Sequence, residues 1–223
     1  MNQDHSKHTP QLEVGLHGWD HAHWCGGFYP EDMPKEWRFS YYSNEFRSVL
    51  LPWSFLSQAS PETVQEWLDD SDESFEFYAE APQAPQWGAF LYLAAELRPQ
   101  LAGVVLPQSS NGLDVSDSLG ADVVLYQRVS SDGLESQNAL QKLPQYTYGC
   151  YCYHDSLQGN VCRTDKVLVN VKDSRITEPR DVRVIVDACL ALPADRVVLI
   201  FSGEAPSLNA ARHAQVIYEL SAS

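Results

Sequence analysis

Residues 48–80 read SVLLPWSFLSQASPETVQEWLDDSDESFEFYAE and place a helix signal between two apolar runs, SVLL and FEFYAE. Ser60 is suited to cap a helix, and Pro61 falls at the first helical position, where its missing N–H is harmless. One apolar helix face follows at Val64, Trp67 and Leu68. The stretch predicts a strand, a helix and a second strand, joined in parallel by a crossover.

The same alternation of strand-length and helix-period segments runs through the rest of the chain. Eight strands are predicted, at residues 12–16, 48–51, 75–80, 101–106, 121–126, 146–153, 167–171 and 197–201. Two later helices are opened by Thr177 with Pro179 and by Ser207. We expect the last helix to turn inward Val216, Ile217 and Leu220.

Eight strands joined by right-handed crossovers predict an α/β fold, a TIM-type (β/α) barrel. Residues 154–166 lack a helical period, so we expect an irregular barrel with one missing or shortened crossover helix. Residues 1–11 are polar and predict a flexible tail, and residues 12–223 a single barrel domain.

The composition limits the partners that this chain can have. Thirty acidic and 15 basic residues give a formal net charge of −15, which repels nucleic acid and anionic membrane surfaces. A polar N-terminus and the lack of a long apolar run predict a cytoplasmic protein without a membrane span. Five scattered cysteines, an odd number, are expected to be free thiols in a reducing compartment.

A series of motifs from Val14 to Pro82 carries a family resemblance: VGLHGW, HWCGGFYPEDMP, YYSNEF, SPETVQEW and FEFYAEAP, in that order. With these motifs the chain resembles the YecE-like family, also called domain of unknown function 72. The resemblance implies a TIM-type barrel whose activity is unknown. It also implies a divergent member, because Leu50, Pro52 and Leu56 stand where the family usually has polar residues, and Glu80 stands where it usually has a lysine.

Imidazole and thiol groups are concentrated in one stretch, at His17, His21, His23 and Cys25. These are the side chains that bind zinc, but no partner Cys-x-x-C follows, so we expect no metal and no other cofactor. The chain also lacks a Gly-rich phosphate loop, a Gly-x-Ser-x-Gly elbow and a His-Glu-x-x-His helix.

In a barrel of this class, a site is built where the strands end at their carboxyl side. The candidate ligand-binding residues at these ends are His17, Trp19, Trp53, Glu80, Gln108 and Arg128. Trp37 and Trp67, at helical spacing, are instead expected in the core. In the alternative interpretation, polar residues at strand ends only cap backbone groups and face water.

Two functions remain open on this basis. The first is a barrel that binds a small ligand or a protein, with weakened or absent catalysis, because polar residues of the family are missing. The second is a hydrolase or phosphoesterase with a rearranged site at the C-terminal mouth. Convergence of Glu80, His17 and Arg128 in one cleft with shifted pKa values would favour the enzyme, and an apolar mouth would disfavour it.

Overall fold

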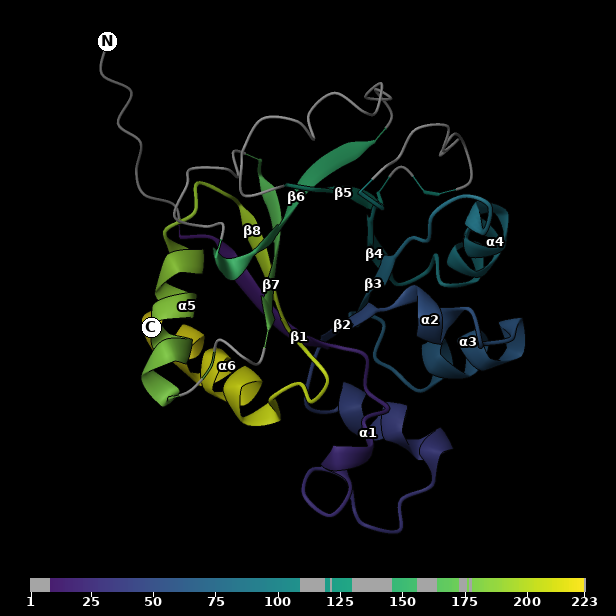
Figure 1. Ribbon diagram of the computed structural model, residues 1–223, viewed down its shortest axis with the longest axis horizontal. Helices are drawn as coiled ribbons and strands as arrows, with labels where there is room; N and C mark the ends of the chain where they lie inside the picture. The colour runs from purple at the N-terminus through teal and green to yellow at the C-terminus, as the bar shows by residue number, and fades with distance from the viewer. Residues whose placement is uncertain are drawn as a thin grey trace.

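A computed structural model of the protein describes residues 9–108, 119–120, 122–129, 146–155, 164–172, 176 and 178–222. Eight parallel strands close a barrel in chain order, from β1 next to β2 round to β8 next to β1 (Figure 1). The strands are β1 (Gln11–His17), β2 (Ser48–Leu51), β3 (Glu76–Glu80), β4 (Leu101–Val105), β5 (Val124–Arg128), β6 (Thr147–Tyr153), β7 (Lys166–Lys172) and β8 (Arg196–Ser202). The predicted TIM-type α/β barrel is confirmed.

The helices lie outside the barrel. They are α1 (Arg38–Ser43), α2 (Trp53–Leu56), α3 (Pro61–Asp69), α4 (Trp87–Glu96), α5 (Pro179–Leu190) and α6 (Leu208–Ala222), with the short 3-10 helices η1 (Ala22–Trp24) and η2 (Lys35–Trp37). Helices α5 and α6 pack together on one side of the barrel, and α3 and α4 on another (Figure 1). No helix among the described residues is long and apolar enough to span a membrane.

The helix starts show how the sequence sets the elements. Ser60 Oγ accepts a hydrogen bond from the Thr63 amide at 3.2 Å, and Pro61 is the first residue of α3, as predicted. Helix α5 begins at Pro179, with Glu178 and Asp181 forming a capping box. The predicted role of Thr177 lies outside the described residues.

The inward face of α6 differs from the prediction. Val216 and Leu220 are 51% and 73% exposed, and Ile217 is only partly buried. The buried residues are Ala210, Ala211 and Ala214. The helix packs against α5, β1 and β8, and small side chains allow its backbone to come close to them. The larger apolar residues near the end of the helix therefore misled the prediction.

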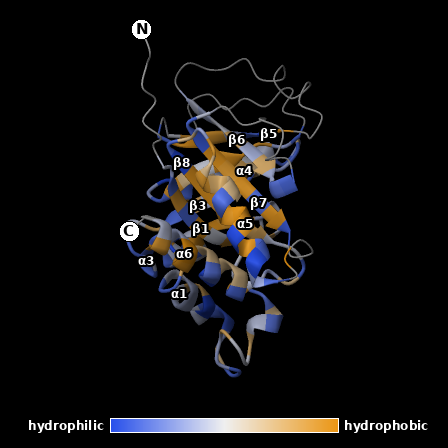
Figure 2. Ribbon diagram, turned by 90° about the vertical axis from the view of Figure 1, so that its left-hand side faces the viewer, coloured by the Kyte–Doolittle hydropathy of each residue, from blue (hydrophilic) through white to orange (hydrophobic). Residues whose placement is uncertain are grey.

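The strands are covered on both faces, as expected of a parallel barrel. The barrel interior holds Leu50, Tyr78, Val105, Tyr126, Tyr151, Leu168, Val198 and Ile200. The opposite strand faces pack against the helices, and Figure 2 shows hydrophobic colour concentrated in the strands and hydrophilic colour at the surface. A Cβ added at Gly103 would lie 2.5 Å from the Tyr126 ring, and one at Gly149 would lie 2.7 Å from it. These glycines make room for the Tyr126 ring inside the barrel.

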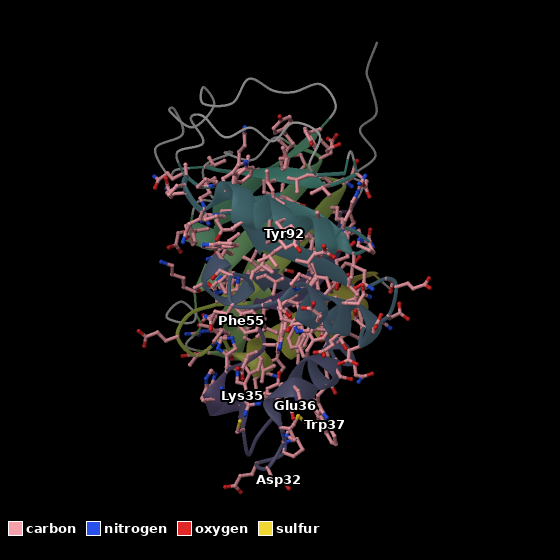
Figure 3. All side chains as sticks on the ribbon, turned by 90° about the vertical axis from the view of Figure 1, so that its right-hand side faces the viewer. Asp32, Lys35, Glu36, Trp37, Phe55 and Tyr92 are labelled. Atoms are coloured by element: carbon pink, nitrogen blue, oxygen red, sulfur yellow. The ribbon has the colours of Figure 1, made fainter. Side chains whose placement is uncertain are left out.

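Two smaller predictions about single residues were wrong. Trp37 is 65% exposed rather than part of the core, because η2 lies in the segment that projects beyond the barrel; Figure 3 shows it there beside Lys35 and Glu36. Trp67 is buried, as expected. Cys150 is disulfide-bonded, so the five cysteines are not all free. Cys25, Cys152 and Cys189 are free thiols.

One strand boundary differs from the prediction, and two other predictions fall largely outside the described residues. The fifth strand starts three residues later than predicted and runs two residues further. The crossover after β6 falls largely in residues 156–163, outside the described part, so its predicted irregularity stays a prediction. The same holds for the predicted tail, since the description begins at residue 9 and β1 at Gln11.

Candidate functional site

Three of the predicted site residues meet at the C-terminal end of the barrel. His17, Glu80 and Arg128 are the last residues of β1, β3 and β5. The His17 Nε2 atom lies 3.2 Å from Glu80 Oε2, and Arg128 Nη2 donates a hydrogen bond to Glu80 Oε1 at 2.9 Å. Inward side chains of one layer in such a barrel come from alternate strands, which is why residues 63 and 48 positions apart in the chain become neighbours.

The polar contacts continue across the mouth of the barrel. The Arg128 guanidinium lies 4.4 Å from the centre of the Tyr151 ring, its register partner on β6. The Tyr151 hydroxyl accepts a hydrogen bond from Asn170 Nδ2 at 2.8 Å, and Ser202 Oγ donates one to Asn170 Oδ1. We call the six residues the mouth network: His17, Glu80, Arg128, Tyr151, Asn170 and Ser202.

The electrostatics of this network keep Glu80 charged. Burial alone raises the pKa of Glu80, but the hydrogen bond and charge of His17 and the charge of Arg128 outweigh it, so the pKa lies below its ordinary value. Burial lowers the pKa of Arg128, but the effects of Tyr151 and Glu80 outweigh it and raise the pKa above its ordinary value. The guanidinium therefore stays charged. Burial raises the pKa of the Tyr151 hydroxyl, which therefore stays protonated at neutral pH.

The other predicted site residues lie elsewhere. Trp19 is buried, and its ring centre lies 4.5 Å from that of Phe39 and 4.9 Å from that of Trp67. Trp53 Nε1 donates to Gln86 Oε1 at 3.0 Å, close to α4. Gln108 is exposed after β4. The structure therefore joins three of the six predicted residues and gives the two tryptophans packing contacts.

Three members of the mouth network were not predicted from the sequence. Tyr151, Asn170 and Ser202 lie in or at the end of apolar strand runs on β6, β7 and β8. A signal was present, because Asn170 is a buried amide within VLVNVK and Ser202 is a buried hydroxyl that ends VVLIFS. Polar groups buried in such runs need hydrogen-bond partners, which they find in one another.

The three residues at which the resemblance implies polar groups have apolar or helix-starting roles. Leu50 is wholly buried in the barrel interior. Pro52 precedes the first residue of α2, and Leu56 is buried against the helices. None of the three contributes a polar group to the mouth.

The histidines and the cysteine near the start of the chain are used in local contacts. His21 Nε2 lies 2.9 Å from the His17 carbonyl oxygen, and burial lowers the pKa of His21. Arg38 Nη2 donates to Cys25 Sγ at 3.0 Å. Within the described ranges, no group of three or more His, Cys, Asp or Glu side chains is placed to hold a metal ion.

A cavity of about 510 Å³ lies at the opposite, N-terminal end of the barrel. Its lining includes the residues that begin six strands: Glu76, Leu101, Val124, Thr147, Lys166 and Arg196. The candidate site predicted from the sequence lies instead at the C-terminal mouth. The segments that follow β4, β5, β6 and β7 belong mainly to residues 109–118, 130–145, 156–163 and 173–175, outside the described part.

The closed barrel of eight parallel strands, with helices outside and a polar layer at the C-terminal strand ends, places the protein among the TIM-type α/β barrels. The family model "Protein of unknown function DUF72" matches residues 13–85, the part that carries the motifs. The predicted resemblance to this family is thereby confirmed over that part of the chain.

Solved structures of two DUF72 family proteins are similar to this chain. The protein from Thermotoga maritima has a TM-score of 0.64 at 16% identity, covering 96% of this chain and 100% of that one. The protein from Enterococcus faecalis has a TM-score of 0.60 at 12% identity, covering 95% and 99%. At these identities the likeness shows the shared fold. In sequence, no curated protein matches the chain.

Proposed function

We propose that the protein binds a small polar molecule at the C-terminal mouth of the barrel, with weakened or absent catalysis. The observation that carries this proposal is the convergence of three ionisable side chains from three alternate strands. The His17, Glu80 and Arg128 side chains remain 25%, 21% and 26% exposed, so each is partly buried but still open to a ligand.

The mouth network has unused hydrogen-bonding capacity. Each Glu80 oxygen accepts one bond, from His17 or Arg128, and a carboxylate oxygen can accept two. Arg128 uses Nη2 for Glu80 and Nε for the Leu106 carbonyl oxygen, at 3.3 Å, while Nη1 has no hydrogen-bond partner within the described residues. A ligand with hydroxyl or amino donors and a carbonyl or anionic acceptor would match both groups.

The rigid support of these side chains favours binding at a defined position. Glu80 is held from two sides, and Arg128 is also stacked on the Tyr151 ring, which Asn170 fixes through its hydroxyl. Preorganised polar groups lose little conformational entropy when a ligand binds. The apolar residues Leu50 and Leu56, in places where the family resemblance implies polar ones, argue for binding without efficient catalysis.

A hydrolase is the second candidate, and the His17–Glu80 pair favours it. A carboxylate that holds an imidazole in place is the arrangement of a general base, and such a base could activate water against a phosphoester. In that case Glu80 would be a positioning residue for His17.

Thermal-shift screening of a metabolite and phosphoester library tests the proposal. We expect at least one small polar compound to raise the melting temperature of the wild-type protein. Glu80→Gln should reduce that shift, whereas Glu66→Gln, at an exposed position on α3, should leave it unchanged. The absence of any stabilising compound, or equal shifts in Glu80→Gln, would refute the site.

Turnover of the same phosphoesters distinguishes the two candidates. The binding proposal expects no hydrolysis that depends on His17. Hydrolysis that is lost in His17→Gln, with a pH profile that follows an imidazole, would favour the hydrolase.

A further inference from the structure

The cavity at the N-terminal end of the barrel is separate from the mouth network. It is lined by strand starts, and the mouth network lies at or near the strand ends. On β7, Lys166 lines the cavity at the first position and Lys172 is the last residue of the strand. The two regions therefore lie at opposite ends of the same strands.

Two tyrosine rings line the inner end of this cavity. Tyr78 and Tyr126 come from β3 and β5, and their ring centres are 6.0 Å apart in an edge-to-face arrangement. Burial raises the pKa of both hydroxyls, which therefore stay protonated. Both side chains are almost wholly buried, at 1% and 2% exposed, so they close the floor of the cavity.

Two cationic side chains lie next to each other in the cavity. Lys166 and Arg196 begin β7 and β8 and are direct register partners. Arg196 uses Nη2 for an ion pair with Glu76, and Glu76 also accepts the Tyr78 hydroxyl at 2.7 Å. The Glu76 carboxylate therefore already accepts hydrogen bonds from both Arg196 and Tyr78.

Donors in this cavity remain unused. Among the described residues, neither Lys166 Nζ nor Arg196 Nη1 has a hydrogen-bond or ion-pair partner. The other two carboxylates of the lining, Glu73 and Asp122, are exposed to water. The free groups inside the cavity are therefore hydrogen-bond donors. A negatively charged acceptor group on a ligand would pair best with the two neighbouring cations.

We propose that this cavity is a second ligand site, which binds a small organic anion. Lys166 and Arg196 hold the carboxylate or phosphate group, and the carbon skeleton lies in the cavity above the floor that Tyr78 and Tyr126 close. The volume of about 510 Å³ suits a monosaccharide-sized ligand. Glu73 and Asp122, at the rim of the cavity, accept hydrogen bonds from hydroxyl or amino groups of the ligand.

Isothermal titration with three probes of similar size tests this site: glucose 6-phosphate, gluconate and glucose, at constant ionic strength and neutral pH. The two anions share the polyol skeleton and differ in the charged group, and glucose is the neutral control. We expect at least one anion to bind and glucose not to bind. Binding by neither anion would overturn the proposal.

Variants at the two ends of β7 locate the binding. Lys166→Gln should weaken the binding of the anion by roughly tenfold, because it removes one charge-assisted hydrogen bond. Lys172→Gln, the same substitution at the other end of the strand, should leave the affinity unchanged. Equal weakening by both variants, or weakening by Lys172→Gln alone, would contradict the cavity as the site.

A second variant keeps the test independent of the folding of Lys166→Gln. Ala102→Leu adds volume to the cavity wall without changing any charge, and it should also abolish anion binding. Undiminished binding in Ala102→Leu would overturn the proposal. Glu80→Gln should not change the affinity for these probes. The test of the cavity is therefore independent of the test of the mouth site.

Discussion

Glu80 is the residue on which the chemistry of the mouth depends. Its two oxygens are each held by a different strand-end cation or imidazole, and this contact lowers its pKa against the effect of burial. The resemblance implies a lysine at this position, whereas here the positive charge beside the β3 end comes from Arg128 on β5.

The lowered pKa of Glu80 predicts how stability depends on pH. A carboxyl group whose pKa is lower in the folded state stabilises the fold above its unfolded pKa, and this contribution is lost as pH falls through the folded pKa. We expect Glu80→Gln to lower the free energy of unfolding by about 1 kcal/mol at pH 7, as for a partly exposed ion pair. Urea unfolding at neutral and acidic pH should show the difference fading towards acid. A difference that grows on acidification would contradict this account.

The residues that converge at the mouth are those for which a polar group at a strand end was the signal. His17, Glu80 and Arg128 could be found because a terminal charged residue after an apolar run faces the mouth. Trp19 could not be assigned, because its large ring suits a pocket as well as a core and only tertiary contacts decide between them. Asn170 went unnoticed because one amide does not interrupt an apolar run.

At the scale of elements, local signals fixed where helices begin better than which face they bury. The Ser60 cap and the Pro179 start lie where the sequence predicted them. The alanine face of α6 was missed because apolar size, rather than closeness of packing, guided the prediction. The β5 boundary shifted because glycine and aspartate come before the strand and the polar Gln127 and Arg128 belong to it.

The fit between Tyr126 and the glycines of its neighbouring strands predicts a specific loss of stability. Gly103→Ala should destabilise the fold by about 1–3 kcal/mol, because the added methyl group overlaps the Tyr126 ring. Gly88→Ala on α4 has open space around it and should be neutral or slightly stabilising. Thermal or urea unfolding measures both.

A second substitution tests the cause. Tyr126→Leu in the Gly103→Ala background should recover part of the loss, because the smaller side chain removes the overlap. Additive losses in the double variant would show that Gly103 is required for a different reason.

At the scale of the whole molecule, acidity sets the long-range electrostatics. With a net charge of −15, we expect no binding to duplex DNA at physiological salt stronger than about 10⁻⁴ M, the weak end of non-specific affinity. Fluorescence anisotropy with labelled duplex measures this directly. Micromolar binding that weakens with added salt would show a basic surface that the overall charge conceals.

The barrel as a whole separates two polar regions along its axis. One is the mouth network, where alternate strands end, and the other is the cavity where the strands begin.

The closed barrel could be predicted from the alternation of segments alone, because eight strand signals with crossovers leave few other arrangements. The cavity could not, since its walls come from six strands and its volume depends on which side chains fill the centre.

The most direct test of the proposed function is the affinity of wild-type protein and Arg128→Gln for the compound that the mouth binds, measured by isothermal titration. Arg183→Gln is the matched control, because Arg183 pairs with Asp187 on the outer surface of α5. The proposed site predicts that Arg128→Gln weakens binding by roughly tenfold or more, while Arg183→Gln has no effect. An unchanged affinity in Arg128→Gln would contradict a ligand site at the C-terminal mouth.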